Sequence, residues 1–544
     1  MVSRFRSVLL FFVISIQLYS CKERPGDARI KTLEPSVAAT LSKTIAEKVT
    51  PQLDSGLQLT LWGVDSLVAD PVSLDIDDQG RVYYTRTNRQ KHSEFDIRNH
   101  PDWEIGSIQL SSIEEKRAFL HKVLSPENSS KNQWLADLNG DGSHDWRDMK
   151  IEKEHVYRLE DRDGDGVADR SQLVVEDFHD ETTDAAGGVM KQGDDLYVGI
   201  GPDLWKIKEG KNGLAQTKTS LSHGYGIHIG FSGHGMSGIE MGPDGRIYWQ
   251  IGDIGFNGTG PKGQKYEHPN SGVIVRANPD GSDFEVFAYG NRNTHEFVFD
   301  AYGNMISEDN DGDHPGESER LVYVVNGADI GWRTNWQFGK YRDPDNNGYK
   351  VWMDEKMYVP RFEGQAAYII PTIKNFVNGP TGMLYNPGTA LGEEYKNKFF
   401  IAEFVGNPSQ SGIHSFSLKP KGAYFEFDRS KMIMKGILAT GKDFGPDGSL
   451  YFGDWIDGWG TKDYGRIWKM DVENPNASKR GNTEQELKAD YSPYPIDRLS
   501  LLLQHEDMRV RQKAQFELVS RGNKGLDALS CLLYTSPSPR DVEE

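Results

Sequence analysis

A turn motif that recurs along the chain constrains its fold more than any other feature. The sequence Gly-Pro-Asp-Gly at residues 242–245 lies between two apolar runs, at residues 239–241 and 247–251. Proline presets φ at the first corner of such a turn, and Asp-Gly accepts the positive φ of the next corner. The two runs are therefore predicted to pair as a β-hairpin. Residues 444–454 repeat this pattern almost unchanged.

Turns of related sequence occur at residues 77–83, 191–197 and 299–304. A hairpin repeated at intervals of tens of residues, without helical periodicity between the copies, is typical of β-propeller blades. We therefore predict an all-β fold, a six-bladed β-propeller over residues 57–470, in preference to a β-sandwich. The approximate blades are residues 60–90, 186–209, 237–290, 294–333, 379–437 and 438–470.

The N-terminal segment has the features of a secretory signal. Two arginines precede an apolar run at residues 8–18, which is too short to span a membrane. The run is followed by a sequence that resembles a bacterial lipobox, with Cys21 as the lipidated residue; an ordinary signal peptide with a chance cysteine is the alternative. We predict a signal peptide at residues 1–20, a tether at residues 21–56, and a lipid-anchored protein of the bacterial cell envelope, periplasmic or on the outer-membrane surface.

The net charge of the chain argues against two classes of partner. With 81 Asp and Glu against 62 Lys and Arg, the formal charge is −19, which disfavours nucleic acid and leaves the lipid as the expected membrane contact. Apart from Cys21, the chain has only Cys531, in a segment (residues 531–541) that resembles a translated sequencing adapter. We therefore interpret residues 531–544 as a non-native tail on a chain that is naturally longer, and expect no disulfide framework and no cysteine-based metal or haem site.

An insertion that breaks the rhythm of the blades is predicted at residues 90–185. Ser112-Ile-Glu-Glu is a capping box, so a helix should run from there to about residue 123. Two acidic loops follow with oxygen spacing like that of an EF-hand, which suits calcium because this cation takes about 6–8 oxygen ligands. At position 12 the first loop has Asp in place of the usual Glu, and the second has Gln172 in place of an acid. A solvated acidic turn is the alternative for each loop. The candidate ligands are Asp137, Asn139, Asp141, Asp145 and Asp148 in the first loop and Asp161, Asp163, Asp165 and Asp169 in the second.

After residue 470 the pattern changes from strands to helices. Residues 493–503 and 508–518 have the apolar spacing of two amphipathic helices. The pair resembles one HEAT repeat, and a single repeat cannot bury its apolar faces alone. We therefore interpret residues 490–530 as the beginning of a truncated HEAT-like domain.

Polar residues gather where predicted strands end, which is where functional groups lie on a rigid β scaffold. His234 precedes the first strand of the opening hairpin, and Gly-Asp at residues 252–253 follows the second. Arg292 and Asn293 stand just before another strand, and an acidic loop at residues 307–319 follows that strand. These segments make up the candidate site.

Together these segments resemble the soluble quinoprotein glucose dehydrogenases and their wider family, six-bladed propellers that hold pyrroloquinoline quinone (PQQ) and calcium. The resemblance covers about residues 60–470. It is carried by a His followed by Gly-Pro-Asp-x-x-Ile-Tyr and Ile-Gly-Asp-x-Gly at residues 234–255, by Gly-x-Arg-Asn at 290–293, and by a Ser-Glu, an acidic loop and a Gly-Trp at 307–332. The order of lipoprotein signal, propeller and HEAT-like helices is similar to the large bacterial "membrane-bound dehydrogenase" proteins, which often end in a c-type haem domain.

The resemblance implies hydride abstraction from a sugar or alcohol, with electrons passed to a cytochrome c domain that would carry haem c downstream of this chain. His234 would be the general base, because a neutral imidazole near pH 7 suits that role. Residues that would bind PQQ are Arg292, Asn293, Asp253 and Asn257. Calcium on the acidic loop would polarise the quinone, and its ligands would be Asp309, Asp311, Asp313 and Glu319.

Two departures from the family pattern leave a second interpretation open. The glucose enzymes have an Asp where this chain has Gly233, and a Gln where it has Gly258. The alternative is a non-catalytic, calcium-stabilised propeller that binds a glycan or a protein partner. His234 would then be a hydrogen-bonded loop residue, and Arg292 a buried, paired structural residue. The sequence leaves open whether the chain is an enzyme.

Overall fold

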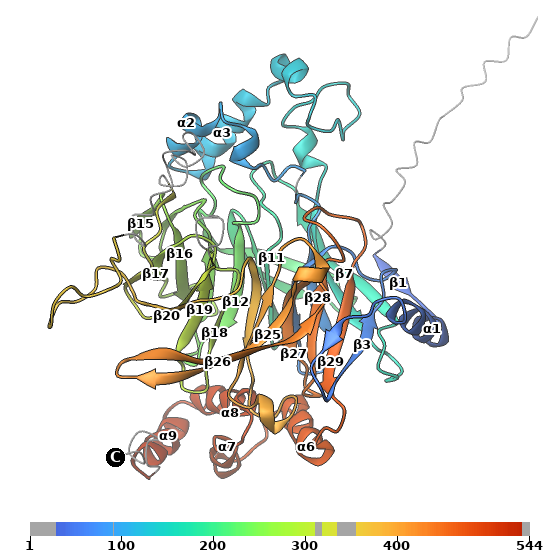
Figure 1. Ribbon diagram of the computed structural model, residues 1–544, viewed down its shortest axis with the longest axis vertical. Coiled ribbons are helices and arrows are strands. Elements are labelled where there is room, and N and C mark those ends of the chain that lie inside the picture. Colours follow the sequence, from blue (N-terminus) through green and yellow to red (C-terminus); the bar gives the residue numbers. More distant parts are fainter. Residues whose placement is uncertain (1–28, 91, 311–317, 335–354, 536–544) are drawn as a thin grey trace, which may run out of the picture.

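A closed ring of six β-sheets forms the body of the protein (Figure 1). The computed structural model describes residues 29–90, 92–310, 318–334 and 355–535. In this part of the chain each sheet has an innermost strand that contacts the innermost strand of the next sheet, and the last contacts the first. These strands are β4 (Pro71–Ile76), β8 (Gly188–Gln192), β12 (Met236–Met241), β18 (Phe297–Phe299), β23 (Pro380–Tyr385) and β27 (Ala439–Phe444). The protein is a six-bladed β-propeller, as its repeated turns predict.

Most strands that complete the blades run antiparallel to their neighbours. The first blade adds β5 (Val82–Arg86), β6 (Glu154–Glu160), β7 (Arg170–Phe178) and β1 (Ile30–Thr32), and the second adds β9 (Asp195–Ile200), β10 (Asp203–Glu209) and β11 (Ala215–His223). The third adds β13 (Ile247–Ile251), β16 (Gly272–Ala277), β17 (Glu285–Asn291) and β21 (Ala328–Asp329), and the fourth adds β19 (Met305–Asp309), β20 (Arg320–Val324) and β22 (Thr372–Asn375). The fifth adds β24 (Phe399–Glu403), β25 (Gly412–Lys421), β26 (Tyr424–Lys435) and β2 (Gln52–Leu53), and the sixth adds β28 (Leu450–Asp454), β29 (Arg466–Val472) and β3 (Leu57–Gly63). A small hairpin, β14 (Phe256–Thr259) with β15 (Lys265–His268), lies outside the blades.

The ring is closed by a strand from the N-terminal side of the chain. β3 pairs antiparallel with β29, and Leu61 lies opposite Trp468. The alternation of residues 57–62 predicts a strand that begins the first blade, and the structure places it in the last blade instead. Alternation indicates a strand but not the strand's partner. Pairing β3 with the last blade ties the N-terminal side of the chain to the end of the propeller and closes the ring.

The first blade differs from the predicted one. Its strands β6 and β7 lie within residues 90–185, so the segment inserted between β5 and β6 is residues 87–153. The second acidic loop, residues 161–169, is the turn that joins β6 to β7. The dense acidic spacing of this turn masks the two strands beside it in the sequence.

The segment predicted as a tether is part of the folded body from residue 29 on. β1 adds an edge strand to the first blade, β2 adds one to the fifth, and α1 (Pro35–Ala46) packs beside β3. The predicted signal peptide and Cys21 lie outside the described residues. Every described helix falls short of the length and apolar character that a membrane span needs.

The inserted segment, residues 87–153, forms a helical layer over one end of the ring (Figure 1). It contains α2 (Glu104–Ile108) and α3 (Ile113–Val123). α3 begins where the capping box predicts, because Ser112 Oγ accepts a hydrogen bond from Glu115 N at 3.1 Å. The apolar cluster of the layer incorporates Phe231 from the loop before β12, which packs the insertion against the segment that carries His234.

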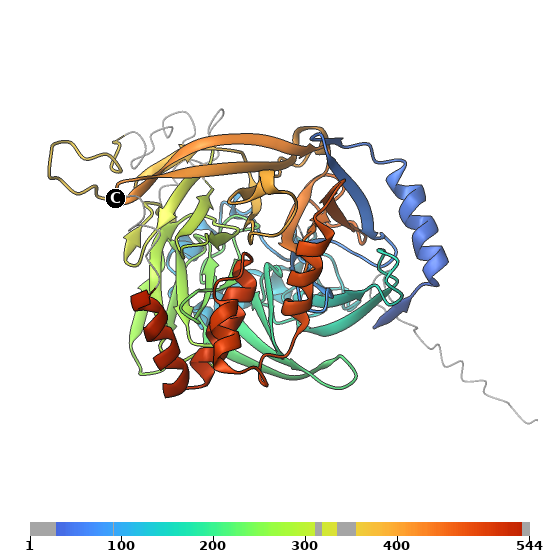
Figure 2. The same cartoon turned by 90° about the horizontal axis from the view of Figure 1, so that it is seen from below.

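In the described residues, four helices follow the propeller and lie across the other end of the ring, as Figure 2 shows from below. They are α6 (Ala477–Lys488), α7 (Ile496–Leu502), α8 (Met508–Ser520) and α9 (Asn523–Thr535). α7 and α8 lie where the sequence indicates helices. α6 was not predicted, and α9 extends into the segment interpreted as a non-native tail. The HEAT-like character of this group remains a prediction.

α8 is bound to the turns of the propeller. Gln512 Nε2 donates to Met241 O at 3.1 Å, and Arg509 Nη1 donates to Phe444 O at 2.7 Å. Both carbonyls belong to the two copies of the Gly-Pro-Asp-Gly hairpin. The helix therefore covers the ring at the end opposite the insertion.

Ring closure by β3 predicts a stability difference between two neighbouring substitutions. Leu61 is fully buried against the last blade, whereas Thr60 is exposed on the same strand. We expect Leu61→Ala to reduce the free energy of unfolding by about 2–5 kcal/mol, and Thr60→Ala to change it by less than about 0.5 kcal/mol. Chemical denaturation of both variants checks this, and equal effects would contradict a structural role for β3.

Candidate functional site

A cavity of about 570 Å³ lies on the propeller axis, at the end of the ring that carries the insertion. We call it the central cavity. Every blade contributes a lining residue at or next to its innermost strand: Val72, Gly187, Met236, His295, Pro380 and Thr440. The second and third blades approach each other closely here. A Cβ added to Gly187 would lie only 2.0 Å from Met236 O, so the position requires glycine. The cavity therefore exists only when all six blades are assembled.

A hydrogen-bonded chain of three side chains reaches the central cavity at His234. The imidazole Nδ1 lies 2.7 Å from Asp253 Oδ1, and Trp332 Nε1 donates to Asp253 Oδ2 at 2.8 Å. All three residues are buried. Because Nδ1 faces a carboxylate, it carries the proton, and Nε2 is left as the basic nitrogen. His234 lines the cavity, so this nitrogen is available to a bound molecule.

Strand register explains why His234 and Asp253 meet. They lie just outside the paired strands β12 and β13, in which Met236 is opposite Ile251. Gly252 N then donates to His234 O at 3.1 Å, and a Cβ on Gly252 would lie only 2.5 Å from that oxygen. The glycine of the Gly-Asp motif thus permits the close approach that aligns the two side chains.

Arginine side chains reach the central cavity, and one of them, Arg98, is ion-paired with Asp96 behind it. Among its described residues the lining has two arginines, Arg98 and Arg292, and one carboxylate, Glu319. The Arg292 guanidinium lies 5.6 Å from the ring centre of Phe231 and 5.4 Å from that of Trp332, distances typical of cation–π contacts. Four aromatic side chains also line the cavity: Phe231, Phe404, Trp455 and Trp459.

Two further polar residues face the central cavity. Asn293 is buried, and its Oδ1 has no hydrogen-bond partner among the described residues. His295 is half-buried, and burial, with smaller contributions from His234 and Lys442, lowers its pKa to about 4. His295 is therefore neutral near pH 7. Sequence spacing does not single out His295, because only the fold places it near His234.

Deeper along the axis lies a pair of opposite charge, the half-buried Glu296 and the buried Lys442. Burial raises the pKa of Glu296 to about 7 and lowers that of Lys442 to about 8. Glu296 Oε2 accepts a hydrogen bond from Met383 N at 2.7 Å, whereas Lys442 Nζ has no hydrogen-bond partner among the described residues. Lys442 contributes to the low pKa of His295 because its positive charge opposes a second one nearby.

Several predicted site residues have other roles in the structure. Asn257 does not line the central cavity, and its side-chain amide donates to Ser111 O at 2.8 Å. Asp309, predicted as a calcium ligand, forms a buried ion pair with Arg320 at 3.1 Å. Glu319 does line the cavity. The other two predicted ligands of this loop, Asp311 and Asp313, lie outside the described residues.

The two EF-hand-like loops differ in how they use their acidic residues. In the second loop, Asp161, Asp163 and Asp165 bring ligand atoms within 4.8 Å of one another, which fits a cation, and no other such group occurs among the described residues. Asp169 of the same loop is instead paired with Arg162 at 2.8 Å.

In the first loop, Asp145 forms an ion pair with Arg147 at 2.6 Å. Asp148 accepts backbone N–H groups from residues 138, 139 and 145. Asp137 also accepts backbone N–H groups of its own loop, and Asn139 and Asp141 are joined by a hydrogen bond of 3.3 Å. The predicted ligands of this loop therefore hold the loop itself together, because a nearby arginine and backbone amides satisfy them.

The fold and the site together define a six-bladed propeller with a histidine–aspartate pair at an axial cavity. A family model described as a domain of unknown function (DUF7133) matches residues 48–458, and the chain belongs to this family. No curated protein matches the chain.

Solved structures with a similar arrangement include three sugar-oxidising proteins. The PQQ-bound aldose sugar dehydrogenase from Streptomyces coelicolor is 13% identical with a TM-score of 0.42, and the match covers 78% of this chain and 100% of that one. The PQQ domain of pyranose dehydrogenase from Coprinopsis cinerea is 10% identical with a TM-score of 0.41, covering 78% and 97%. The soluble aldose sugar dehydrogenase from Escherichia coli is 14% identical with a TM-score of 0.40, covering 59% and 93%.

The low pKa of His295 predicts a specific dependence of stability on pH. Between its ordinary pKa of about 6.5 and the folded-state value of about 4, the unfolded chain binds a proton that the folded chain does not. Stability contributed by neutral His295 is therefore present above pH 6.5 and is lost as the pH falls towards 4. We expect His295→Gln to lose less stability than the parent between pH 6.5 and 4, measured by urea denaturation. Identical slopes in the two proteins would contradict the lowered pKa.

Proposed function

We propose that the protein is a PQQ-dependent dehydrogenase that oxidises a sugar or an alcohol in the central cavity. One observation carries the proposal. His234, Asp253, Arg292 and Asn293, which the sequence resemblance assigns to catalysis or cofactor binding, come from separate segments and meet at one cavity. Such convergence of an oriented base with polar groups in a single pocket is the expected form of an active site.

The described lining fits PQQ. This cofactor is planar and carries three carboxylates, and the central cavity offers two arginines, one carboxylate and four aromatic rings. Guanidinium groups bind carboxylates through fixed N–H donors, and aromatic rings stack on planar ligands. The buried Asn293 Oδ1 lacks a partner in the described structure, as expected for an atom that faces a ligand. Arg98, Arg292 and Asn293 would hold the cofactor.

The chemistry assigned to the protein's own residues begins with the substrate hydroxyl. His234 Nε2 takes the hydroxyl proton while the carbon loses a hydride, which leaves a carbonyl product. Asp253 keeps the Nδ1 proton in place and stabilises the imidazolium that forms, and Trp332 fixes Asp253 through its second oxygen. When bound, PQQ supplies the acceptor for the hydride.

Calcium, the electron acceptor and the location are further parts of the proposal. Glu319 and the loop after β19 are the calcium site that the resemblance implies, and the cluster of Asp161, Asp163 and Asp165 is a separate structural site for the same cation. A cytochrome c is the proposed acceptor. The lipid anchor at Cys21 would place the protein in the cell envelope.

Binding of the cofactor tests the proposal directly. Calorimetric titration of the purified protein with PQQ, with and without calcium chloride, should show saturable binding. We expect Arg292→Gln to weaken this binding at least about tenfold, since one charged hydrogen bond is worth about 1.5–3 kcal/mol. The matched control is Arg276→Gln, on the same blade outside the cavity, which should leave it unchanged.

No PQQ binding by protein with an intact melting transition would contradict the proposal. It would favour the alternative of a non-catalytic propeller that binds a glycan or a protein. Because Arg292 is buried, its variant is also checked by its melting transition, and Asn293→Ala provides a second test in which no charge is removed.

The role of His234 predicts a loss of rate without loss of cofactor. His234→Gln should reduce the rate of dye reduction with a sugar or alcohol at least about 100-fold while PQQ binding stays within about twofold of the parent. His223→Gln, at the exposed end of β11 on the second blade, is the control and should retain full activity. Unchanged dye reduction in His234→Gln would remove His234 as the base.

A further inference from the structure

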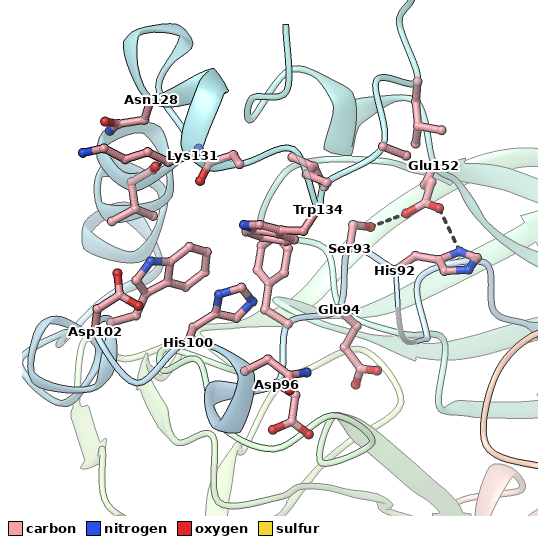
Figure 3. A pocket seen from close by; sticks show the side chains of 18 residues that line it. His92, Ser93, Glu94, Asp96, His100, Asp102, Asn128, Lys131, Trp134 and Glu152 are labelled. Carbon is pink, nitrogen blue, oxygen red and sulfur yellow. Dashed lines mark hydrogen bonds and ion pairs between the residues drawn. The ribbon is translucent and has the colours of Figure 1, made fainter.

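A second and larger cavity lies in the inserted segment, beside the central cavity. It has a volume of about 910 Å³, and all of its lining residues lie between His92 and Glu152. We call it the insertion cleft. Figure 3 shows Ser93, Glu152 and His92 together on one side of the cleft, and Asn128 and Lys131 on another. Nothing in the proposed oxidation uses this cleft.

Aromatic rings form one wall of the insertion cleft. Trp134 is 47% exposed, and His100 lies 4.5 Å from it between ring centres. His100 is stacked on Trp103 at 4.1 Å, and Phe95 meets both indoles edge to face. The rings hold one another in place, so the indole of Trp134 presents a fixed, half-exposed face to the cleft.

The described lining of the insertion cleft has more carboxylates than cations: Glu94, Asp96, Asp102 and Glu152 against Lys131. Asp96 is paired with Arg98 at 2.5 Å, and Glu152 accepts hydrogen bonds from Ser93 and from His92, whose Nδ1 lies 3.2 Å away. Burial lowers the pKa of His100, so its imidazole is neutral near pH 7. An excess of carboxylates repels an anionic ligand, whereas carboxylates accept hydrogen bonds from the hydroxyls of a neutral one.

Two exposed side chains of the cleft, Asp102 and Lys131, can also hydrogen-bond a neutral ligand. Neither side chain makes a hydrogen bond or ion pair to another described residue. The indole N–H of Trp134 also has no hydrogen-bond partner in the described structure. An aromatic face flanked by a free acceptor and free donors matches the surface of a sugar, which has C–H groups on its faces and hydroxyls on its rim.

Only a thin wall separates the insertion cleft from the central cavity. Glu94 lines the cleft, and its carboxylate accepts a hydrogen bond at 2.5 Å from Gly233 N, which lines the central cavity. Asp96 lines the cleft, and its ion-pair partner Arg98 lines the central cavity. The two hollows therefore share a wall that is one pair of side chains thick.

From this geometry we propose that the insertion cleft binds a neutral glycan, with one sugar ring stacked on Trp134 and its hydroxyls bonded to Asp102 and Lys131. The binding does not depend on oxidation in the central cavity. A second part of the proposal rests on the proposed function. Because the two cavities are so close, the substrate would be a glycan chain whose end is oxidised in the central cavity while a neighbouring sugar unit is bound in the cleft.

Calorimetry on the full protein without PQQ tests the proposal. The probes are four neutral hexasaccharides: cellohexaose, laminarihexaose, mannohexaose and xylohexaose. At least one should bind saturably, and Trp134→Ala should weaken that binding at least about tenfold. Asp102→Asn should weaken it less, because one charge-assisted hydrogen bond is replaced by a neutral one. The matched control is Tyr302→Ala, an exposed aromatic on the α8 side of the ring, which should leave affinity unchanged.

Three results would overturn the inference. The first is no binding of any of the four glycans by folded protein. The second is binding that Trp134→Ala leaves intact and that Trp459→Ala, at the central cavity, removes. The third is binding of tetramethylammonium that depends on Trp134 in the absence of glycan binding, which would make the cleft a cation cage. Glycan binding that depends on Trp134 in a protein that does not bind PQQ would support the cleft and reject only the dehydrogenase.

Discussion

Pairing of β3 with β29 is the interaction on which the rest of the structure depends. It joins residues 57–63 to residues 466–472 and converts a row of blades into a ring. The central cavity crosses this seam, because Val72 lies on one side of it and Thr440 on the other. Thr440 Oγ1 also donates to Pro71 O at 2.9 Å across the seam. Without closure, the loops that carry His234 and Arg292 would have no opposite wall.

The two copies of the turn motif separate what the fold needs from what the site adds. Asp253 and Asp454, which end the two hairpins, each accept a hydrogen bond of 2.8 Å from a tryptophan Nε1. That bond is therefore part of how such a blade is built. Eight residues before Gly-Pro-Asp-Gly, the third blade has His234 and the sixth has Ile437. The third blade thus adds an imidazole to an aspartate that the fold already holds in position. No further residue is needed to orient the base.

Features that depend on a few neighbouring residues, such as turns and hairpins, can be predicted from this sequence, whereas pairings between distant segments cannot. The turns predict the innermost hairpins and the number of blades. The motifs at residues 234–255 and 290–293 single out His234 and Arg292, which the fold brings to one cavity. The partner of β3 is not predictable in this way, because it lies about 400 residues away. The acidic loops show a different limit of local sequence. Spacing indicates which oxygens could converge, but Arg147 and Arg162 lie within the loops and take Asp145 and Asp169 for themselves.

The position of α8 makes the two ends of the propeller axis different. Many propellers are open at both ends of the axis, but here α8 is bound to the turns at one end, where Glu240 and Asp443 at the far ends of the inner strands line a hollow of about 360 Å³ beneath it. The central cavity is at the other end, where Gln90 and Arg98 of the insertion line it. The two hollows therefore lie at opposite ends of the axis, with α8 beside one and the insertion beside the other. A molecule bound in the central cavity touches both the propeller and the insertion, so a change in the insertion alters the cavity without altering a blade.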